Sequence, residues 1–294
     1  MELKKESFTI KKGLDIQLEG EAVRNLKTHL SSKSYIFPTD FRWFVPKLLV
    51  KEGDPVTVGT PLFCKKRDER VCVVSPVNGK ITQIVRGEKR VLEVIEIENE
   101  ATSIPKRCEI PENLSSSIIQ SLMLQNGLWP MLRQRPFSVI PSPDKKPKSL
   151  FISCFDSSPL APDFFFLLNN QKEMWQKGVE ILKLLLGEIP IYLGLNSNDN
   201  NSIFEETKDV NIRYFSGPHP AGNVGTQIHL VDPINKGESV WFIHPQDVVT
   251  IGRFFLKGEL SFDRIVALTG PELTETGYWK VNYGSDLKPL LMPL

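Results

Sequence analysis

The hydrophobic pattern of this chain changes its period at one proline-rich stretch, and this change limits what the chain can fold into. Residues 136–148 read PFSVIPSPDKKPK, and prolines at this density favour an extended linker. Short β-branched runs bounded by Gly, Pro and Asn precede the stretch, whereas strand-like and helix-like periods alternate after it. With 294 residues the chain is long enough for two domains. We therefore predict an all-β module followed by an α/β domain.

Strand-forming segments fill residues 8–100, reading FTIKKGLDI, LLVKEGDPVTVGTPLF, VCVVSPVNGKITQIVRG and RVLEVIEIE. The phrases GDPVTVGTPL and SPVNGKI resemble the two halves of a biotinyl/lipoyl-type barrel-sandwich, in which turns separate strands that pack on each other. Carrier proteins of this type display a lysine at a hairpin tip. Lys65 and Lys66 occupy the corresponding segment among other charges, so a solvated hairpin is the expected structure and a carrier lysine is the alternative.

A helix is predicted between this module and the linker. The segment NLSSSIIQSLMLQNG (113–127) has apolar residues at spacings of three and four. Ser115 is a candidate for its N-cap, and Gly127 can end it.

Strands and helices alternate after the linker. The expected strands read SLFISCF, IPIYLGL, VNIRYFSG, SVWFIHP and RIVALTGP, and the expected helices read DFFFLLNNQKEMWQKGVEILKLLLG and QDVVTIGRFFLKG, the second stopped by Gly258. Such alternation needs crossover connections and predicts a mostly parallel sheet, which binds ligands at the carboxyl ends of its strands. The loop SGPHPAGNVGT follows the expected strand VNIRYF and therefore lies where a site is expected.

Bulk properties exclude several classes of function. The formal net charge is +1, which gives no reason to expect nucleic acid as a partner. The N-terminus MELKKESFTIKKG lacks the apolar core of a signal peptide, and the longest apolar clusters are far shorter than the roughly 20 residues of a membrane span. A membrane role would therefore be peripheral. No cysteine pair has ligand spacing, so we expect reduced thiols and neither zinc nor iron–sulfur ligation at Cys64, Cys72, Cys108 and Cys154.

The loop SGPHPAGNVGT (216–226) does not complete a nucleotide-binding motif. Gly217 and Gly222 have the spacing of a P-loop, but Asn223 and Val224 replace the Lys and the Ser or Thr that would meet phosphate and Mg²⁺. Pro220 replaces the first glycine of a dinucleotide fingerprint and offers no backbone N–H. We expect a rigid, shaped loop without a nucleotide.

The histidines of this half do not predict a metal site, because the spacing of His219, His229 and His244 matches no ligand motif. His219, held between two prolines, is expected to make a structural hydrogen bond. His229, in the alternating TQIHLV, is expected to be half-buried.

Long blocks of the chain resemble the A subunit of the Na⁺-translocating NADH:quinone oxidoreductases (Na⁺-NQR). They include NGLWPMLRQRPFSVIPSPDKKPKSLFI, SGPHPAGNVGTQIHLVDP and VWFIHPQDVVTIGRFFLKGEL. Family members continue into a β-grasp module and a helical tail, and YWKVNYGSDLKPLLMPL is similar to the opening of that module, so the resemblance implies a truncated chain. The implied domains are a barrel-sandwich (1–107), a helix and linker (108–148), a Rossmann-like α/β domain (149–272) and the start of a β-grasp (273–294).

The resemblance extends to the NADH- and FMN-binding subunit of respiratory complex I, with one difference. That subunit carries the flavin loop GRGGAGFPTG, whereas Arg135, Pro136, Phe137 and Ser138 stand in the equivalent stretch here. Side chains would fill the space in which flavin approaches bare backbone. The resemblance therefore implies a flavoprotein scaffold without a flavin or NADH site.

The family implies a function for the complex and a supporting role for this chain. The complex is a sodium-transporting translocase of the respiratory chain, which couples NADH oxidation and ubiquinone reduction to Na⁺ export and uses flavins and iron–sulfur centres. This chain is expected to bind no cofactor, to lie peripherally on the cytoplasmic face of the bacterial inner membrane, and to contact the other subunits, especially the membrane subunits. The isolated chain is expected to be inactive. The alternative is an electron-input subunit that binds flavin and NADH.

The resemblance also raises ubiquinone as a ligand. A quinone needs an apolar slot and one or two donors to its carbonyls. The candidates for quinone contact or docking are Gly217, His219, Gly222, Gly225, Phe215 and Trp129. His219→Ala is expected to spare folding and to reduce quinone reduction or assembly.

Overall fold

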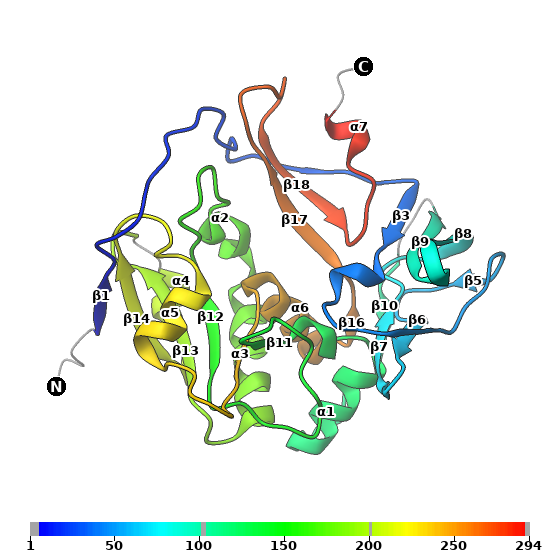
Figure 1. Ribbon diagram of the computed structural model, residues 1–294, viewed down its shortest axis with the longest axis horizontal. Coiled ribbons are helices and arrows are strands. Elements are labelled where there is room, and N and C mark those ends of the chain that lie inside the picture. The colour runs from blue at the N-terminus through cyan, green and yellow to red at the C-terminus, as the bar shows by residue number, and fades with distance from the viewer. Residues whose placement is uncertain (1–5, 101–103, 200–201, 292–294) are drawn as a thin grey trace.

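The central sheet of the α/β domain explains where this chain can hold a ligand. The computed structural model describes residues 6–100, 104–199 and 202–291 (Figure 1). Its six-stranded sheet has the order β1-β14-β13-β12-β15-β11, and the four inner strands run parallel to one another. These strands are β12 (Leu150–Ser153), β13 (Ile191–Asn196), β14 (Asn211–Ser216) and β15 (Val240–Phe242). In chain order they run third, second, first, fourth, which is the order of one half of a Rossmann-like sheet.

The two edges of this sheet come from outside the α/β segment. β1 (Ser7–Thr9) pairs parallel with β14, and β11 (Arg133–Arg135) pairs antiparallel with β15. The sequence placed FTIKKGLDI with the N-terminal strands, and that placement is wrong for β1. The reason is packing, because Phe8 stacks on the buried Phe215 of β14 with ring centroids 5.4 Å apart.

Helices cover both faces of the sheet. α3 (Lys172–Leu186) and α6 (Pro245–Lys257) pack against each other over one face, and α1 (Ser116–Gln125) packs on α3. α5 (Val224–Val231) covers the opposite face, where Ile228 packs with Phe151 and Val240. Ser115 caps α1 by accepting a hydrogen bond from the Ile118 amide, and Gly258 ends α6 in a left-handed conformation, as the sequence predicted.

Two local expectations are wrong. The single helix expected after the first strand is divided into α2 (Phe164–Leu168) and α3 by a tight turn, Asn169–Gln171, because asparagine competes with the helical backbone for hydrogen bonds. The segment TQIHLV, read as alternating, lies in α5. Its helix starts at Asn223, whose side chain accepts a hydrogen bond from the Gly225 amide. A short helix, α4 (Ser202–Glu205), follows β13.

The N-terminal module forms two small antiparallel sheets that enclose a common core. One has the order β3-β9-β8-β5 and the other β4-β6-β7. Buried Phe63, Ile81 and Ile95 fill the space between them. The strands are β3 (Lys33–Ile36), β4 (Pro46–Leu48), β5 (Pro55–Val56), β6 (Pro61–Lys65), β7 (Asp68–Val74), β8 (Gly79–Arg86) and β9 (Leu92–Asn99). Lys65 ends β6 and Lys66 lies in the turn before β7, so both stand at the expected hairpin.

The C-terminal residues form a third unit with the N-terminal segment. β17 (Asp263–Leu268) pairs antiparallel with β18 (Gly277–Asn282), and β2 (Leu26–Thr28) adds a parallel third strand. The expectation that RIVALTGP joins the parallel sheet is therefore wrong. In Figure 1 the N-terminal segment, in blue, runs from β1 across the molecule towards β18. Short elements complete the chain: β10 (Lys106–Arg107), β16 (Glu259–Leu260) and α7 (Lys288–Leu291).

The apolar residues of the expected β-grasp segment are partly covered in this unit. Tyr278 and Trp279 are buried, Leu287 and Leu290 pack against the cluster that contains Trp279, and Leu291 is half exposed. Residues 292–294 of the segment 273–294, and residues 1–5 of the N-terminal module, lie outside the described part of the chain.

Candidate functional site

The loop SGPHPAGNVGT is held from two sides by other parts of the chain. The backbone N–H of His219 donates to Asp15 Oδ1 at 3.0 Å, and its carbonyl accepts from the Leu14 amide at 3.1 Å. Its Nδ1 lies 3.1 Å from Ser157 Oγ, which also accepts from the Gly222 amide at 2.8 Å. These contacts tie the loop after β14 to the N-terminal segment and to the loop after β12.

The three glycines of this loop serve different purposes. Gly217 has φ +101°, and a Cβ there would lie 2.1 Å from the carbonyl oxygen of Ile10. Gly222 does not have a positive φ, and a Cβ would instead meet the Ser157 amide nitrogen at 2.4 Å. Gly225 lies in α5, where a Cβ would meet only Asn223 Oδ1 within 4 Å. Gly217 therefore adopts a backbone angle that other residues resist, whereas Gly222 and Gly225 do not.

Phe215 and Trp129 do not join His219 around a slot. Phe215 is fully buried on β14 between Phe8 and Phe155. Trp129 is equally buried near the opposite edge of the sheet, where its ring meets Trp241 edge-on at 5.7 Å. Its indole N–H donates to the Pro141 carbonyl at 3.0 Å. The structure places both rings in the core.

The histidines are separated as well. His229 is exposed on α5, which contradicts the expectation of a half-buried side chain, because the segment is helical. His244 is the N-cap of α6, and its Nδ1 accepts a hydrogen bond from the Gln246 amide at 3.2 Å. Within residues 6–100, 104–199 and 202–291, no group of three or more His, Cys, Asp or Glu side chains could hold a metal ion.

A different feature, an interdomain cavity of about 620 Å³, has the character of a ligand site. It lies where the N-terminal module, the linker, the α/β domain and the C-terminal sheet meet. We call it the central cavity. Representative lining residues from the four parts are Phe41, Arg133, Phe242, His244, Asp247 and Tyr283.

The central cavity lies at the carboxyl end of β15. In a doubly wound sheet, ligands bind beyond the carboxyl ends of the strands where the chain order reverses. Here that reversal falls between β12 and β15, whereas the loop containing His219 follows β14, two strands away. The sheet therefore favours the central cavity over the loop.

An ionic cluster lies on the α6 side of the central cavity. Arg264 Nη2 donates to Asp247 Oδ1 at 2.8 Å, and its Nη1 lies 3.4 Å from His244 Nδ1. Burial lowers the pKa of His244 to about 4, so the imidazole is neutral at pH 7. Because Nδ1 accepts from the Gln246 amide, the proton lies on Nε2, which is a hydrogen-bond donor.

Arg133 and Tyr283 supply further donors. The Arg133 guanidinium donates to the Pro130 carbonyl at 2.7 Å, lies 5.3 Å over the Phe41 ring and, within the described residues, forms no ion pair with a carboxylate. Burial lowers the pKa of Arg133 and raises that of Tyr283, so the phenol keeps its proton. Burial also raises the pKa of Asp40. With Phe41 and Phe242 as walls, the central cavity can hold a planar, carbonyl-bearing ring.

Comparisons with known proteins match this chain to the models of one family. The model of the NqrA second alpha/beta domain matches residues 114–260, and that of the NqrA N-terminal barrel-sandwich hybrid domain matches residues 8–100. The chain belongs to the NqrA family. Its predicted fold class, a barrel-sandwich module followed by an α/β domain, is thereby confirmed.

Relatives of this NqrA-family chain match along almost all of its length. The A subunit of the Na(+)-translocating NADH-quinone reductase of Actinobacillus pleuropneumoniae serotype 5b (strain L20) is 35% identical over 291 residues. The same subunit of Haemophilus influenzae (strain ATCC 51907 / DSM 11121 / KW20 / Rd) is 34% identical over 288 residues, and that of Glaesserella parasuis serovar 5 (strain SH0165) is 35% identical over 290. Each match covers 96% of this chain and 64% of the relative.

The stretch that the sequence resemblance sets against the flavin loop forms a hairpin in this family member. The Gln134 amide donates to the Val139 carbonyl at 2.7 Å and the Val139 amide donates back at 3.2 Å, which closes a hairpin. Arg135 lies 4.9 Å over the Phe242 ring, and residues 128–148 contain no glycine. The stretch therefore lacks the glycines with which a flavin loop brings bare backbone to a phosphate or an isoalloxazine ring.

Sequence reasoning missed the residues of the central cavity. His244 lies at the end of the expected strand SVWFIHP and Asp247 follows it in the next helix, so this strand end carried the same positional signal as the loop after β14. Arg133 and Tyr283 carried no such signal, because the chain brings them to the central cavity from the linker and the C-terminal sheet.

Proposed function

We propose that this chain is a cofactor-free peripheral subunit of a Na⁺-translocating NADH:quinone reductase, at the quinone-reducing end. The complex would couple NADH oxidation and ubiquinone reduction to Na⁺ export, and the chain would lie on the cytoplasmic face of the bacterial inner membrane. The observation that carries the proposal is the match of both domains, over 96% of the chain, to proteins named as the A subunit of that reductase. Their activity and partners are proposals for this chain, which spans 64% of their length.

Two features of the structure support a peripheral role without a cofactor. Among the described helices, none is both long and apolar enough to cross a membrane. A hairpin closes residues 134–139, the stretch that the sequence resemblance sets against a glycine-rich flavin loop. The alternative, an electron-input subunit that binds flavin and NADH, would need a phosphate cradle for which this stretch offers no glycine.

The central cavity favours direct contact between this chain and quinone. Phe41 and Phe242 contribute apolar lining for a ring, and Arg133, Tyr283 and His244 would supply donors to its carbonyl oxygens. In the loop around His219, the backbone N–H of His219 donates to Asp15 and its imidazole contacts Ser157, so these groups already have partners within the chain. We therefore assign quinone contact to the central cavity and a supporting role to the loop.

Two measurements test the proposal, one on the purified chain and one on the chain produced with its proposed partners. An absorption spectrum should lack a stoichiometric flavin band, and a tagged chain produced together with the membrane subunits of the reductase should co-purify with them from membranes. A bound flavin would favour the electron-input alternative. Recovery of the tagged chain alone, without any membrane subunit, would contradict the peripheral role.

A further inference from the structure

One turn of the N-terminal module forces a tryptophan into solvent. The Phe44 amide donates to the Phe41 carbonyl at 3.0 Å, and both phenylalanine rings are buried against Phe63. Trp43, between them, is 63% exposed and has φ +57°, a conformation that costs a bulky side chain steric strain. Strained residues that persist in a fold gather at binding sites. Trp43 is therefore not explained by packing alone.

The Trp43 ring belongs to a small exposed aromatic pair. Phe137, at the tip of the linker hairpin, is 48% exposed and lies 4.9 Å from Trp43 between ring centroids. The Arg42 guanidinium lies 5.3 Å over the Trp43 ring. The other four of the five tryptophans in the sequence are buried, so exposure of an indole is confined to this position.

The aromatic pair borders a groove of about 770 Å³ between the β6–β7 hairpin and the linker. We call it the basic groove. Its cationic residues Arg42, Lys65 and Arg67 form no ion pair within the described part of the chain. Three further exposed cations lie next in sequence to residues that line the groove. They are Lys66 in the hairpin turn, and Lys145 and Lys146 in the linker.

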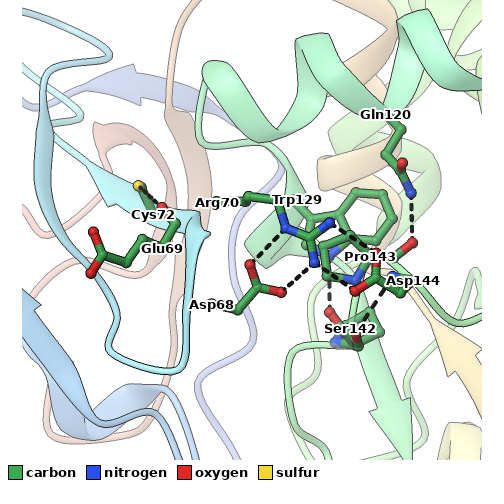
Figure 2. Close-up of polar contacts among 10 residues, drawn as sticks. Asp68, Glu69, Arg70, Cys72, Gln120, Trp129, Ser142, Pro143 and Asp144 are labelled. Carbon is green, nitrogen blue, oxygen red and sulfur yellow. Dashed lines mark hydrogen bonds and ion pairs between the residues drawn. The ribbon is translucent and has the colours of Figure 1, made fainter.

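The two carboxylates of the basic groove share one arginine. Figure 2 shows Arg70 between Asp68 and Asp144, and it donates two hydrogen bonds to each at 2.6–2.8 Å. This bidentate contact joins the hairpin to the linker and fixes the two walls of the groove relative to each other. The lining holds four cations, Arg70 included, against two carboxylates, so the groove carries a net charge of +2 beside exposed aromatic surface.

We propose that the basic groove binds an acidic segment of a partner protein, which places an apolar side chain against Trp43 and Phe137. Asp and Glu side chains would pair with Arg42, Lys65 and Arg67, and the fixed walls would lower the cost of ordering the site. A lipid surface is planar, whereas the cations here line a concave groove that suits an extended chain. The inference rests on the proposed function at one point, which is the identity of the partner as another subunit of the reductase.

The test uses the whole chain and a fluorescein-labelled peptide of alternating Glu and Asp with one Leu and one Phe. Anisotropy should show saturable binding that weakens as NaCl is added. Binding should also protect tryptophan fluorescence from acrylamide, because Trp43 is the exposed indole. Binding without such protection would overturn the assignment, as would absence of binding. Protection by phosphatidylglycerol vesicles but not by the peptide would replace the proposal with a lipid site.

Three variants locate the binding. Arg42→Glu/Arg67→Glu should weaken the peptide about tenfold or more, because both cations are exposed and unpaired. Trp43→Gly should weaken peptide binding similarly while keeping the melting temperature at or above that of wild type, since glycine adopts positive φ freely.

The control Lys11→Glu/Lys12→Glu makes the same charge change on the exposed N-terminal segment and should leave the affinity for the peptide within about twofold of wild type. An equal loss of affinity in the two charge variants would show that binding depends only on net charge, and this would overturn the assignment to the basic groove. Because no quinone or other subunit is present, failure here leaves the proposed function standing.

Discussion

His244 links the start of α6 to the chemistry of the central cavity. Burial lowers the pKa of His244 from 6.5 to about 4. Between pH 4 and pH 6.5 the imidazole is therefore protonated in the unfolded chain but neutral in the folded chain. The stability contributed by neutral His244 is present above pH 6.5 and is lost as the pH falls towards 4. Asp247 and Arg264 oppose each other in this shift, so burial decides its direction.

We predict that His244→Asn flattens the pH dependence of stability. Asparagine retains an N-cap acceptor for the Gln246 amide but does not titrate. Urea unfolding between pH 4 and 6.5 should show a smaller slope for the variant, with a difference of up to about 1.4 kcal/mol per pH unit. Identical slopes would mean that the folded protein accepts the proton on His244 as readily as the unfolded chain.

The loop around His219 yields a second prediction. His219→Ala removes the contact with Ser157 and should cost about 0.5–1.5 kcal/mol, because the main-chain bonds to Asp15 and Leu14 remain. Gly222→Val should cost more, since its Cβ would overlap the backbone of Ser157. Urea denaturation of the two variants checks this order. A costlier His219→Ala would mean that the imidazole holds the loop.

At the level of elements, α3 and α6 cross at two glycines. A Cβ on Gly252 would lie 1.7 Å from the Met174 carbonyl oxygen, and one on Gly178 would lie 2.1 Å from that of Val248. The helices therefore approach more closely than alanine would permit. These glycines lie inside predicted helices, where an isolated glycine signals a packing requirement.

Gly252→Ala should destabilise the protein by about 1–3 kcal/mol, although alanine favours an isolated helix by about 1 kcal/mol. The matched control is Gly225→Ala in α5, where a Cβ meets only Asn223 Oδ1 at 3.2 Å. We expect the control to stay within about 1 kcal/mol of wild type. Chemical denaturation distinguishes the two, and equal stabilities would show that the helices can separate without cost.

A buried ion pair joins α6 to the C-terminal sheet. Burial alone would raise the pKa of Asp263, but the hydrogen bond and charge of Arg253, aided by Ser261 and Lys280, outweigh it and hold that pKa well below its usual range. The stability gained from the ionised carboxylate is therefore present above pH 3.8 and is lost as the pH falls below it.

Arg253→Met leaves the Asp263 carboxylate with Lys280 at 3.1 Å and Ser261 at 2.6 Å as its remaining partners, and should cost about 1–3 kcal/mol at pH 7. The loss should shrink at acidic pH, where the variant carboxyl group is protonated. Lys172→Met, which breaks an exposed pair with Glu206, is the control and should cost less than about 1 kcal/mol. A pH-independent loss for Arg253→Met would mean that packing, rather than charge, is responsible.

Across the whole molecule, local signals predicted most elements but not their assembly. Ser115, Gly258 and the strand runs marked helix ends and strands because caps and periodicity act over a few residues. Pairing of β1 with β14 and of β2 with β18 joins residues about 200 or more positions apart, and no local pattern specifies it. The central cavity was missed for the same reason, since its donors arrive from four parts of the chain.

Quinone contact through the central cavity, and not through the loop around His219, is tested most directly by titrating the purified chain with a short-tailed ubiquinone analogue in a calorimeter. We predict saturable binding of one molecule per chain. Arg133→Leu should weaken it about tenfold or more, because it removes a guanidinium that has no carboxylate partner within the described residues, whereas His219→Ala should leave it within about twofold. Absence of binding, or loss on His219→Ala with Arg133→Leu unchanged, would contradict the assignment of quinone to the central cavity.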